Sequence, residues 1–331
     1  MNRREVRLRS RPAGWPTAEN FELAEVELPE LNEGDVLVRN HYLSVDPYMR
    51  GRMNDVKSYV PPFVVGKVME GGAVGEVIGS RSDKVSLGDW VLSMQGWRDA
   101  YVAPESQVQV VRREGARMAD YLSVLGVTGM TAWVGLNLVD TKAGDRVFIS
   151  AAAGAVGSIA GQLAKQRGCF VVGSAGSADK VAVLKDELGF DAAFNYHDGD
   201  LTAQLAAAAP QGIDVYFDNV GGDHLEAALN AMRARGRVSA CGAISRYNDE
   251  TPRPGPSNLG MVIGKRLTIR GFIVSDHMSE QPAFFSEVGP LLRAKKIVVR
   301  ETIVSGLERM PEAFLEMLRG GNIGKMLVRL D

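Results

Sequence analysis

The sequence predicts an α/β protein of two parts, an all-β region followed by a doubly wound parallel sheet covered by helices. Short apolar runs separated by turn residues fill the chain up to about residue 125, with little helical periodicity. From Gly126 onward, strand-like and helix-like segments alternate, which is typical of βαβ units. A chain of 331 residues is also too long for one small core, so two domains are expected.

In the first part, strands are expected over residues 34–45, 70–80, 87–94 and 100–111, which carry Gly or Asp at their ends. The basic start of the chain is not followed by an apolar stretch, so it is not a secretory signal. It is either a weak phosphate or partner patch or a solvated leader strand, and the pattern favours the strand. At the other end, residues 307–330 read as an amphipathic helix, a glycine turn and a closing strand.

The second part alternates regularly between expected helices and strands. Helices are expected over residues 128–140, 155–167, 177–188, 201–209 and 222–232. Strands are expected over residues 145–150, 169–175, 192–196, 213–220 and 236–243. Residues 266–276 are rich in β-branched side chains and form either an edge strand or an internal strand of this sheet.

The glycine-rich turn "AAAGAVG" follows the first of these strands and opens a helix. It keeps the spacing of a dinucleotide fingerprint, with Ala152 in place of the first glycine, then Gly154 and Gly157. Gly154 lets backbone N–H groups approach a pyrophosphate, and Gly157 lets the helix pack closely on the strand. The helix dipole favours the phosphates at the same point. The alternative is a tight turn that binds nothing.

The end of the next strand indicates which dinucleotide binds. An NAD site usually has an acidic residue there, about 20 residues beyond the fingerprint, to bind the ribose 2′-hydroxyl. This chain has Gly173, Ser174 and then Lys180, which favour a 2′-phosphate and therefore NADPH. Lys180 could also be a solvated helix lysine.

Composition excludes several other classes. Hydrophobic content of 45%, charged content of 24% and a net charge of −2 describe an ordinary globular protein with no expected nucleic-acid partner. No apolar run approaches the roughly 20 residues of a membrane helix. Two cysteines, Cys169 and Cys241, indicate a reducing compartment, and we expect a cytoplasmic enzyme in which both thiols pack. The four histidines are dispersed, so no metal site is predicted, and no G-x-S-x-G elbow indicates a hydrolase.

The chain resembles the zinc-independent medium-chain dehydrogenases/reductases over nearly its whole length. The branch it resembles contains prostaglandin reductases, plant alkenal double-bond reductases and bacterial NADPH-dependent curcumin reductases. Zinc-dependent relatives carry Gly-His-Glu where this chain has "GKVMEGGAVGEV", with Lys67 and Val68 in the vicinity. The motifs that carry the resemblance are "LSVDPYMRGRM", "AAAGAVGS", "NYHDGD", "DNVGG", "CGAISRYN", "RGFIVSD" and "GLERMPEAFLEMLRGGNIGKMLV".

The resemblance implies a GroES-like catalytic domain over residues 1–125, completed by about residues 300–331, and a Rossmann NADP-binding domain over residues 126–299. It also implies a homodimer formed through Rossmann edge strands. The positions that match the branch's cofactor contacts, together with Gly157 from the fingerprint, are Gly154, Ala155, Val156, Gly157, Ser174, Lys180, Tyr196, Asn219, Cys241, Ala243, Ile244, Ser245, Tyr247, Phe272, Ile273, Val274 and Asn322. Asn219 and Cys241 also lie where expected strands end, which is where such sheets bind ligands.

The hypothesis for the reaction is reduction of the C=C bond of an α,β-unsaturated ketone or aldehyde. Hydride passes from NADPH to the β-carbon, and hydrogen-bond donors stabilise the enolate that forms. The candidate donors are Tyr48, Tyr59 and Tyr247, each of which could instead be a packing residue. Tyr59 lies in a candidate lid before two prolines, and the proton on the α-carbon comes from water or a tyrosine.

One position departs from the branch. Several relatives have a substrate-binding tyrosine just before "RGFIVSD", whereas Gly264 occupies that place here. Either another tyrosine donates to the substrate oxygen or the pocket is wider and admits a bulkier enone. Two rival functions also remain open, an NADPH:quinone reductase and a non-catalytic NADPH-binding protein.

Overall fold

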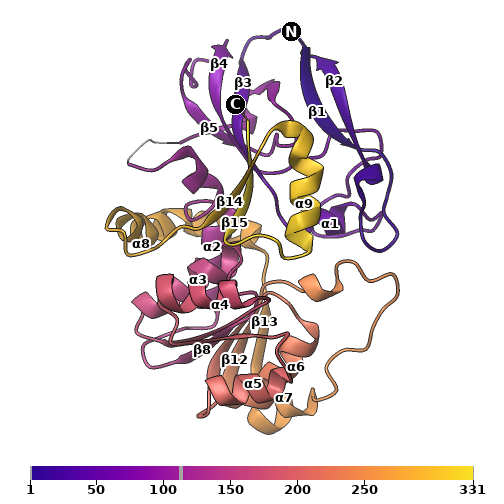
Figure 1. The fold of residues 1–331 in the computed structure, drawn as a ribbon. Coiled ribbons are helices and arrows are strands. Elements are labelled where there is room, and N and C mark those ends of the chain that lie inside the picture. The colour runs from indigo at the N-terminus through magenta and orange to yellow at the C-terminus, as the bar shows by residue number, and fades with distance from the viewer. Residues whose placement is uncertain (1, 112–114, 331) are drawn as a thin grey trace. The chain divides into compact units, whose positions relative to one another are not determined.

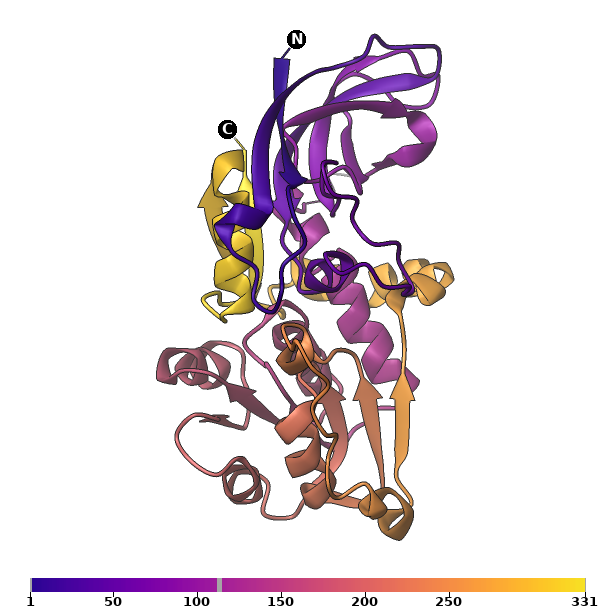
Figure 2. The ribbon, with the colours of Figure 1, turned by 90° about the vertical axis from the view of Figure 1, so that its right-hand side faces the viewer.

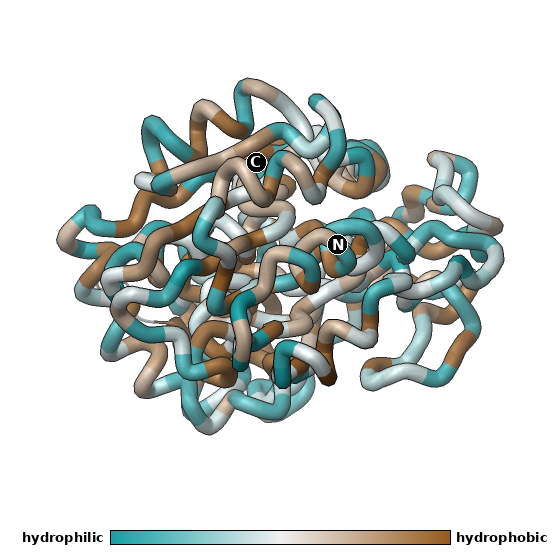
Figure 3. The backbone as a smooth tube through the Cα atoms, turned by 90° about the horizontal axis from the view of Figure 1, so that it is seen from below, coloured by the Kyte–Doolittle hydropathy of each residue, from teal (hydrophilic) through white to brown (hydrophobic). Residues whose placement is uncertain are grey.

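The computed structural model describes residues 2–111 and 115–330 and divides the chain into two compact units. The first unit comprises Met1–Leu122 and Glu301–Asp331, and the second comprises Ser123–Arg300 (Figures 1 and 2). The sequence predicts these boundaries after about residue 125 and after residue 299. Apolar and hydrophilic residues alternate at short intervals along the backbone (Figure 3), and no helix of the described residues is long and apolar enough to span a membrane.

The first unit is built on a β-sheet that combines strands β3 to β7 with two strands from the C-terminal part of the chain. Its order in the described residues is β14-β15-β3-β4-β5-β7, with β6 also paired to β3. The C-terminal strand β15 lies between β14, to which it is parallel, and β3, to which it is antiparallel. The strands are β3 (Asp35–Ser44), β4 (Ala73–Ser80), β5 (Trp90–Ser93), β6 (Ala100–Pro104), β7 (Gln109–Val110), β14 (Glu301–Ser305) and β15 (Lys325–Arg329).

A separate hairpin contains the basic start of the chain. Strand β1 (Asn2–Leu8) pairs with β2 (Phe21–Glu27) in antiparallel register. That register places Arg4 opposite Glu25 and Arg7 opposite Glu22, so cross-strand carboxylates offset the positive charge. The interpretation of this stretch as a leader strand is therefore confirmed.

The core of the first unit lies between this hairpin, helix α1 (Tyr48–Arg52) and helix α9 (Met310–Leu318). The Trp97 ring stacks on Phe21 at 5.8 Å and meets Phe314 edge-on at 5.9 Å. All three side chains are buried, and each comes from a different part of the sequence. The amphipathic helix expected near the C-terminus therefore buries its apolar face in this core.

The second unit contains a parallel sheet whose order in the described residues is β10-β9-β8-β11-β12-β13. The first strand, β8, lies at the centre, and the chain reaches the other half of the sheet when it passes from β10 to β11. This is the doubly wound order of a Rossmann fold, so the predicted fold class is confirmed. The strands are β8 (Arg146–Ile149), β9 (Phe170–Ala175), β10 (Ala192–Asn195), β11 (Ile213–Asp218), β12 (Met232–Ala240) and β13 (Thr268–Gly271).

The helices of the second unit follow the expected alternation. They are α2 (Val127–Leu138), α3 (Ala155–Gln166), α4 (Ala178–Ala182), α5 (Leu201–Ala208), α6 (Gly222–Ala231), α7 (Gly260–Lys265) and α8 (Gln281–Arg293). The single helix expected over residues 177–188 is wrong in its second half, where a π-helical turn, η4 (Val183–Glu187), follows α4. The wider turn lets Val183, Leu184 and Leu188 all be buried.

Candidate cofactor and substrate sites

The parallel sheet brings most of the predicted cofactor residues to one edge. All five strand pairings are parallel, so the carboxyl ends of the strands lie at the same edge. Ligands bind at this edge in doubly wound sheets, at the point where the strand order reverses. The residues that directly follow the six strands are Ser150, Gly176, Tyr196, Asn219, Cys241 and Phe272.

The turn between β8 and α3 forms a cradle of backbone groups. Ala151 takes the left-handed conformation, with φ of 47°, whereas Ala152 does not. This explains why alanine is tolerated at the first fingerprint position, since the strained residue is its neighbour. Ala152 is fully buried, and its N–H donates to Ser174 O at 2.9 Å.

The glycines of the turn keep this cradle open. A Cβ on Gly157 would lie 2.5 Å from Ala151 O and 2.8 Å from Ala152 Cα, so only glycine fits there without a backbone shift. A Cβ on Gly154 would lie 3.2 Å from Ala151 O and would reduce the space above the turn. Gly154 is the N-cap of α3, and no side chain of the described residues caps that helix. The first N–H groups, those of Ala155 and Val156 among them, therefore suit a pyrophosphate.

Near the end of β9, the structure places the side chains of two serines, Ser174 and Ser177, in different environments. Ser174 is fully buried, and its Oγ has no hydrogen-bond partner in the described residues. In this conformation its hydroxyl is closed off from a ligand, which speaks against the expected contact with a 2′-phosphate. Ser177, which sequence reasoning overlooked, is partly exposed and caps α4 by accepting from the Lys180 N–H at 3.4 Å. Its N-cap position before a helix was the signal that could have identified it.

Lys180 lies half-buried on α4, and burial lowers the pKa of its ammonium. Tyr196 lies beside Gly176, which is in the turn between β9 and α4. A Cβ built on Gly176 would be 3.2 Å from the Tyr196 hydroxyl. The Tyr196 ring packs edge-on against buried His224, with centroids 5.1 Å apart. Burial lowers the pKa of His224 to about 4, so the imidazole is neutral near pH 7. His224 was not predicted, because a histidine on a helix gives no sequence signal for this contact.

A buried network joins β8 to β11 where the strand order reverses. Asn219 donates from its backbone N–H to Ser150 Oγ at 3.0 Å and from Nδ2 to Ser150 O at 2.8 Å. The Asp218 carboxylate accepts from the N–H groups of Val220 and Gly221 at 2.9 and 2.7 Å and from the Tyr216 hydroxyl at 2.7 Å. Burial raises the pKa of Asp218, although these hydrogen bonds oppose that shift. The network holds Asn219 at the sheet edge.

The segment after β12 is tied to the same turn. Cys241 N–H donates to Asp218 O at 2.9 Å, Ile244 N–H to Asn219 O at 3.3 Å and Ser245 Oγ to Val220 O at 2.6 Å. The predicted Cys241, Ala243, Ile244, Ser245 and Tyr247 therefore lie beside Asn219. The Tyr247 hydroxyl accepts from the Ala243 N–H at 3.4 Å.

The surroundings of Cys241 disfavour the ionised form of its thiol. Burial, and then the charge of Asp218, raise the pKa of Cys241 to about 12. A thiol with that pKa stays protonated near pH 7, and only the thiolate is a strong nucleophile. Its expected role in packing fits this environment.

The remaining predicted residues lie at β13 and in the first unit. Phe272 and Ile273 directly follow β13, and Val274 begins the 3-10 helix η6 (Val274–Glu280). All three are partly buried. Asn322 belongs to the first unit, where its Nδ2 donates to Gly324 O at 2.7 Å in the turn before β15.

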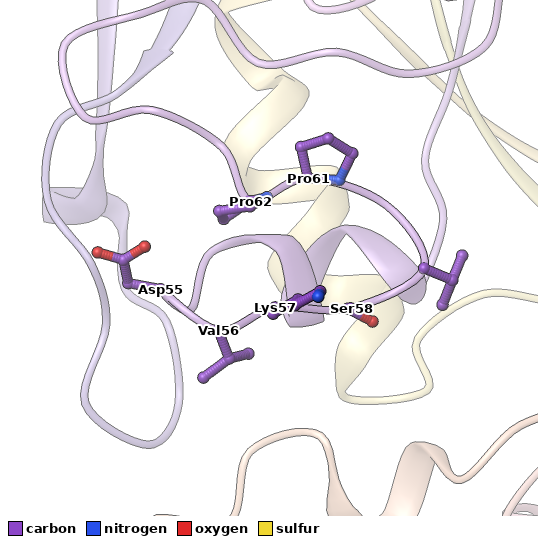
Figure 4. A pocket seen from close by; sticks show the side chains of 7 residues that line it. Asp55, Val56, Lys57, Ser58, Pro61 and Pro62 are labelled. Atoms are coloured by element: carbon purple, nitrogen blue, oxygen red, sulfur yellow. The ribbon is translucent and has the colours of Figure 1, made fainter.

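The first unit also carries two of the candidate catalytic tyrosines. Tyr48 is the first residue of α1 and packs against the core. Its burial, followed by the charge of Asp46, raises the pKa of the phenol well above its usual range. Tyr59 is 63% exposed and lines an open hollow of about 530 Å³. In Figure 4 one bent segment lines this hollow, with Pro61 and Pro62 on the limb that returns above Val56 and Lys57.

Two further positions bear on substrate and metal. Gly264 lies on α7, and a Cβ built on it would meet nothing within 4 Å. Over residues 2–111 and 115–330, no group of three or more His, Cys, Asp or Glu side chains is placed to hold a metal ion.

Two family models match the chain. Residues 4–111 match the model described as "N-terminal domain of oxidoreductase", and residues 155–315 match "Zinc-binding dehydrogenase". The chain is 41% identical over 335 residues to "NADPH-dependent curcumin reductase" of Escherichia coli (strain K12), covering 99% of this chain and 97% of that protein. It is 41% identical over 339 residues to "2-alkenal reductase (NADP(+)-dependent)" of Nicotiana tabacum, covering 100% and 98%. The solved structure of CurA from Vibrio vulnificus in complex with NADPH is similar with a TM-score of 0.95 at 39% identity, covering 99% of both chains.

Proposed function

Because the chain belongs to the medium-chain dehydrogenase/reductase family, we propose that it is an NADPH-dependent oxidoreductase that reduces the C=C bond of α,β-unsaturated ketones and aldehydes. The family resemblance predicted from the sequence is confirmed. The observation that carries the proposal is the match to named double-bond reductases over essentially the whole length of both chains. The backbone cradle at α3 fits the cofactor that those names require.

The residues of the second unit divide the binding of the cofactor between them. The first N–H groups of α3 would hold the pyrophosphate, and Gly157 keeps that helix close to its strand. Lys180 would pair with the 2′-phosphate, and Tyr196 would contact the adenosine half. Asn219 and the segment from Cys241 to Tyr247 would line the nicotinamide half, since hydrogen bonds fix them together at the sheet edge.

When bound, NADPH supplies the hydride that the reduction needs. The task left to the chain is to stabilise negative charge on the substrate's carbonyl oxygen as the β-carbon is reduced. A phenol with a raised pKa remains protonated, so Tyr48 can donate a hydrogen bond without ionising. We assign Tyr48, Tyr59 and Tyr247 as the candidate donors, and Tyr59 as the one on the wall of the hollow. Water or one of these tyrosines then protonates the α-carbon.

The proposed reaction needs no metal. Lys67 and Val68 lie in the vicinity of the position at which zinc-dependent relatives carry their ligand motif, and neither side chain suits zinc. Metal analysis of the purified protein, together with activity after chelation, tests this point. Stoichiometric zinc whose removal abolishes turnover would contradict it.

The decisive experiment follows the decay of NADPH absorbance with a panel of enones, enals and quinones, and repeats the panel with NADH. Oxidation of NADPH that depends on an enone or enal, with formation of the saturated product, would support the proposal. Turnover of quinones alone would make the chain a quinone reductase. Binding of NADPH without turnover of any member would make it a binding protein.

We also propose that the protein is a cytoplasmic homodimer. Strand β13 lies at the open edge of the parallel sheet, and all four of its residues are exposed. A second copy could add its own β13 to that edge and so satisfy the unpaired backbone groups. The two free cysteines, Cys169 and Cys241, support a reducing compartment.

A further inference from the structure

Three arginines surround the segment that carries Tyr59, and the proposed reaction uses none of them. We call residues 54–62 the Tyr59 segment. It leaves the end of α1, lines the hollow of about 530 Å³, and returns to the core at Phe63. Val56 and Tyr59 are 58% and 63% exposed, so these two side chains present apolar surface at the hollow, on either side of Lys57 and Ser58.

Arg52 holds the returning end of the segment. Its Nε donates to Pro61 O at 2.9 Å, its Nη2 donates to Glu70 at 2.8 Å, and its guanidinium lies 4.0 Å from the centroid of the Phe63 ring. A backbone hydrogen bond holds the same end of the segment, from the Phe63 N–H to Arg52 O at 2.7 Å. The side chain is buried, so these contacts fix its conformation. A planar guanidinium makes all of them at once, whereas a lysine ammonium cannot.

Arg11 joins both ends of the segment from outside. Its Nη1 donates to Met53 O at 2.9 Å, just before the segment, and its Nη2 donates to Phe63 O at 3.1 Å, just after it. The same Nη2 lies 3.5 Å from the Asp55 carboxylate. Arg50 adds one bond at the start, from Nη1 to Asn54 Oδ1 at 2.7 Å. The two ends are thus held by charged donors, and the exposed Val56 and Tyr59 lie between them.

We infer that Arg52 and Arg11 are positioning residues that fix the Tyr59 segment and thereby set the affinity for enones with bulky apolar substituents. This inference rests on the proposed function for its substrate. In the proposed reaction, neither arginine contacts the reacting atoms. They act by holding Val56 and Tyr59 where the substituent remote from the C=C bond would pack, which costs less when the surface is preformed.

The first test does not depend on activity. Trypsin cleaves after Lys57, which is exposed in the middle of the segment. In Arg52→Lys we expect cleavage after Lys57 to accelerate about 10-fold, the scale of one lost charged hydrogen bond. Cleavage after Lys185, which is exposed in the second unit, should not change. Equal acceleration at both sites would mean general destabilisation and would overturn the inference, as would no acceleration at either.

The second test compares a bulky enone, 4-phenylbut-3-en-2-one, with a small one, methyl vinyl ketone. In Arg52→Lys we expect KM for the bulky enone to rise about 10-fold while kcat changes little, and KM for the small enone to change much less. The Kd for NADPH should stay unchanged. A proportional rise in both KM values would overturn the inference.

A matched control and a second variant keep these tests informative. Arg309→Lys makes the same substitution in the same unit, at an arginine that pairs with Glu312 on an exposed face, and should leave both KM values unchanged.

If Arg52→Lys does not fold, Arg11→Lys repeats the tests at a more exposed arginine. Val56→Ala should raise KM for the bulky enone in the wild-type background and add little in the Arg52→Lys background. Additive effects would overturn the inference. If the wild type turns over neither enone, the proposed function fails, while the trypsin test still decides the role of the arginines.

Discussion

At the scale of single residues, Lys180 decides between two cofactors in our proposal. Lys180→Ala should weaken NADPH binding by about 10- to 100-fold, because one charged hydrogen bond to a phosphate is lost. NADH has no 2′-phosphate, so its affinity should be nearly unchanged. Fluorescence titration with both cofactors measures the two effects.

Lys185→Ala is the control for this prediction, because Lys185 is an exposed lysine on the following turn and has no role in the proposal. An equal loss of affinity for NADPH and NADH in Lys180→Ala would show that the lysine supports the fold of α4 rather than the phosphate.

The two glycines of the cradle should respond differently to alanine. In Gly157→Ala the new Cβ would meet backbone atoms at 2.5 and 2.8 Å, so α3 must move away from the turn. We expect a loss of about 1–3 kcal/mol in the free energy of unfolding, together with weaker NADPH binding. Gly154→Ala meets one atom at 3.2 Å and should cost less stability. Urea unfolding of both variants compares them, and equal losses would contradict the packing argument.

His224 makes stability depend on pH. Burial lowers its pKa from 6.5 to about 4, so between these values the unfolded chain binds a proton that the folded chain does not. Stability due to this group is therefore present above pH 6.5 and falls as the pH drops toward 4, by at most about 3 kcal/mol. His224→Phe keeps an aromatic ring beside Tyr196 and should flatten this dependence. Unfolding free energies at several pH values check it, and an unchanged slope in the variant would refute the assignment.

The residues of the site differ in how far the sequence could predict them. Gly154, Gly157 and Asn219 follow from spacing and from strand ends, because backbone geometry fixes what those positions need. Ser174 was predicted from the family resemblance and from its place near the end of β9, where the structure buries its side chain fully. The contacts of Arg52 and Arg11 join residues far apart in sequence, and no local pattern indicates them.

At the scale of elements, periodicity predicted the alternating strands and helices but not their irregularities. The π-helical turn η4 inserts an extra residue into a helix so that several apolar side chains can be buried. Strand β12 begins at Met232, earlier than the expected residue 236, and its register with β11 shifts near Ile213. Both features depend on tertiary packing, which a short window of sequence does not contain.

Strand β13 carries the prediction that belongs to this scale. Ile269 lies on this exposed edge strand, and a charge there opposes pairing with a second copy. Ile269→Lys should convert a dimer into a monomer of 35.7 kDa, as measured by light scattering after size-exclusion chromatography. Leu87→Lys changes a more exposed apolar residue, in the first unit, and should leave the mass unchanged. A wild-type monomer, or a dimer that survives Ile269→Lys, would contradict the edge-strand model.

At the scale of the whole molecule, the expectation was that the two ends of the chain belong to one domain. The family resemblance supplied that expectation, since composition and periodicity do not reveal which strands pair over long distances. The structure inserts β15 between β14 and β3, and it buries α9 against the hairpin of β1 and β2. The second unit, in contrast, is a continuous stretch of chain that contains every predicted cofactor residue except Asn322.

This difference predicts the effect of removing the C-terminal segment. A chain that ends at Arg300 loses β14, β15 and α9, which contribute the buried Met310, Phe314 and Val328 to the core of the first unit. Without them the first unit should not fold, because the loss of one such large side chain alone costs about 2–5 kcal/mol, comparable with the stability of a domain. The second unit keeps its own sheet and cradle, so it should still unfold cooperatively and bind NADPH. Calorimetry measures the unfolding of each unit, and cofactor fluorescence measures NADPH binding. Loss of NADPH binding would show that the second unit does not bind the cofactor by itself. A first unit that still melts cooperatively would show that it does not need the C-terminal segment to fold.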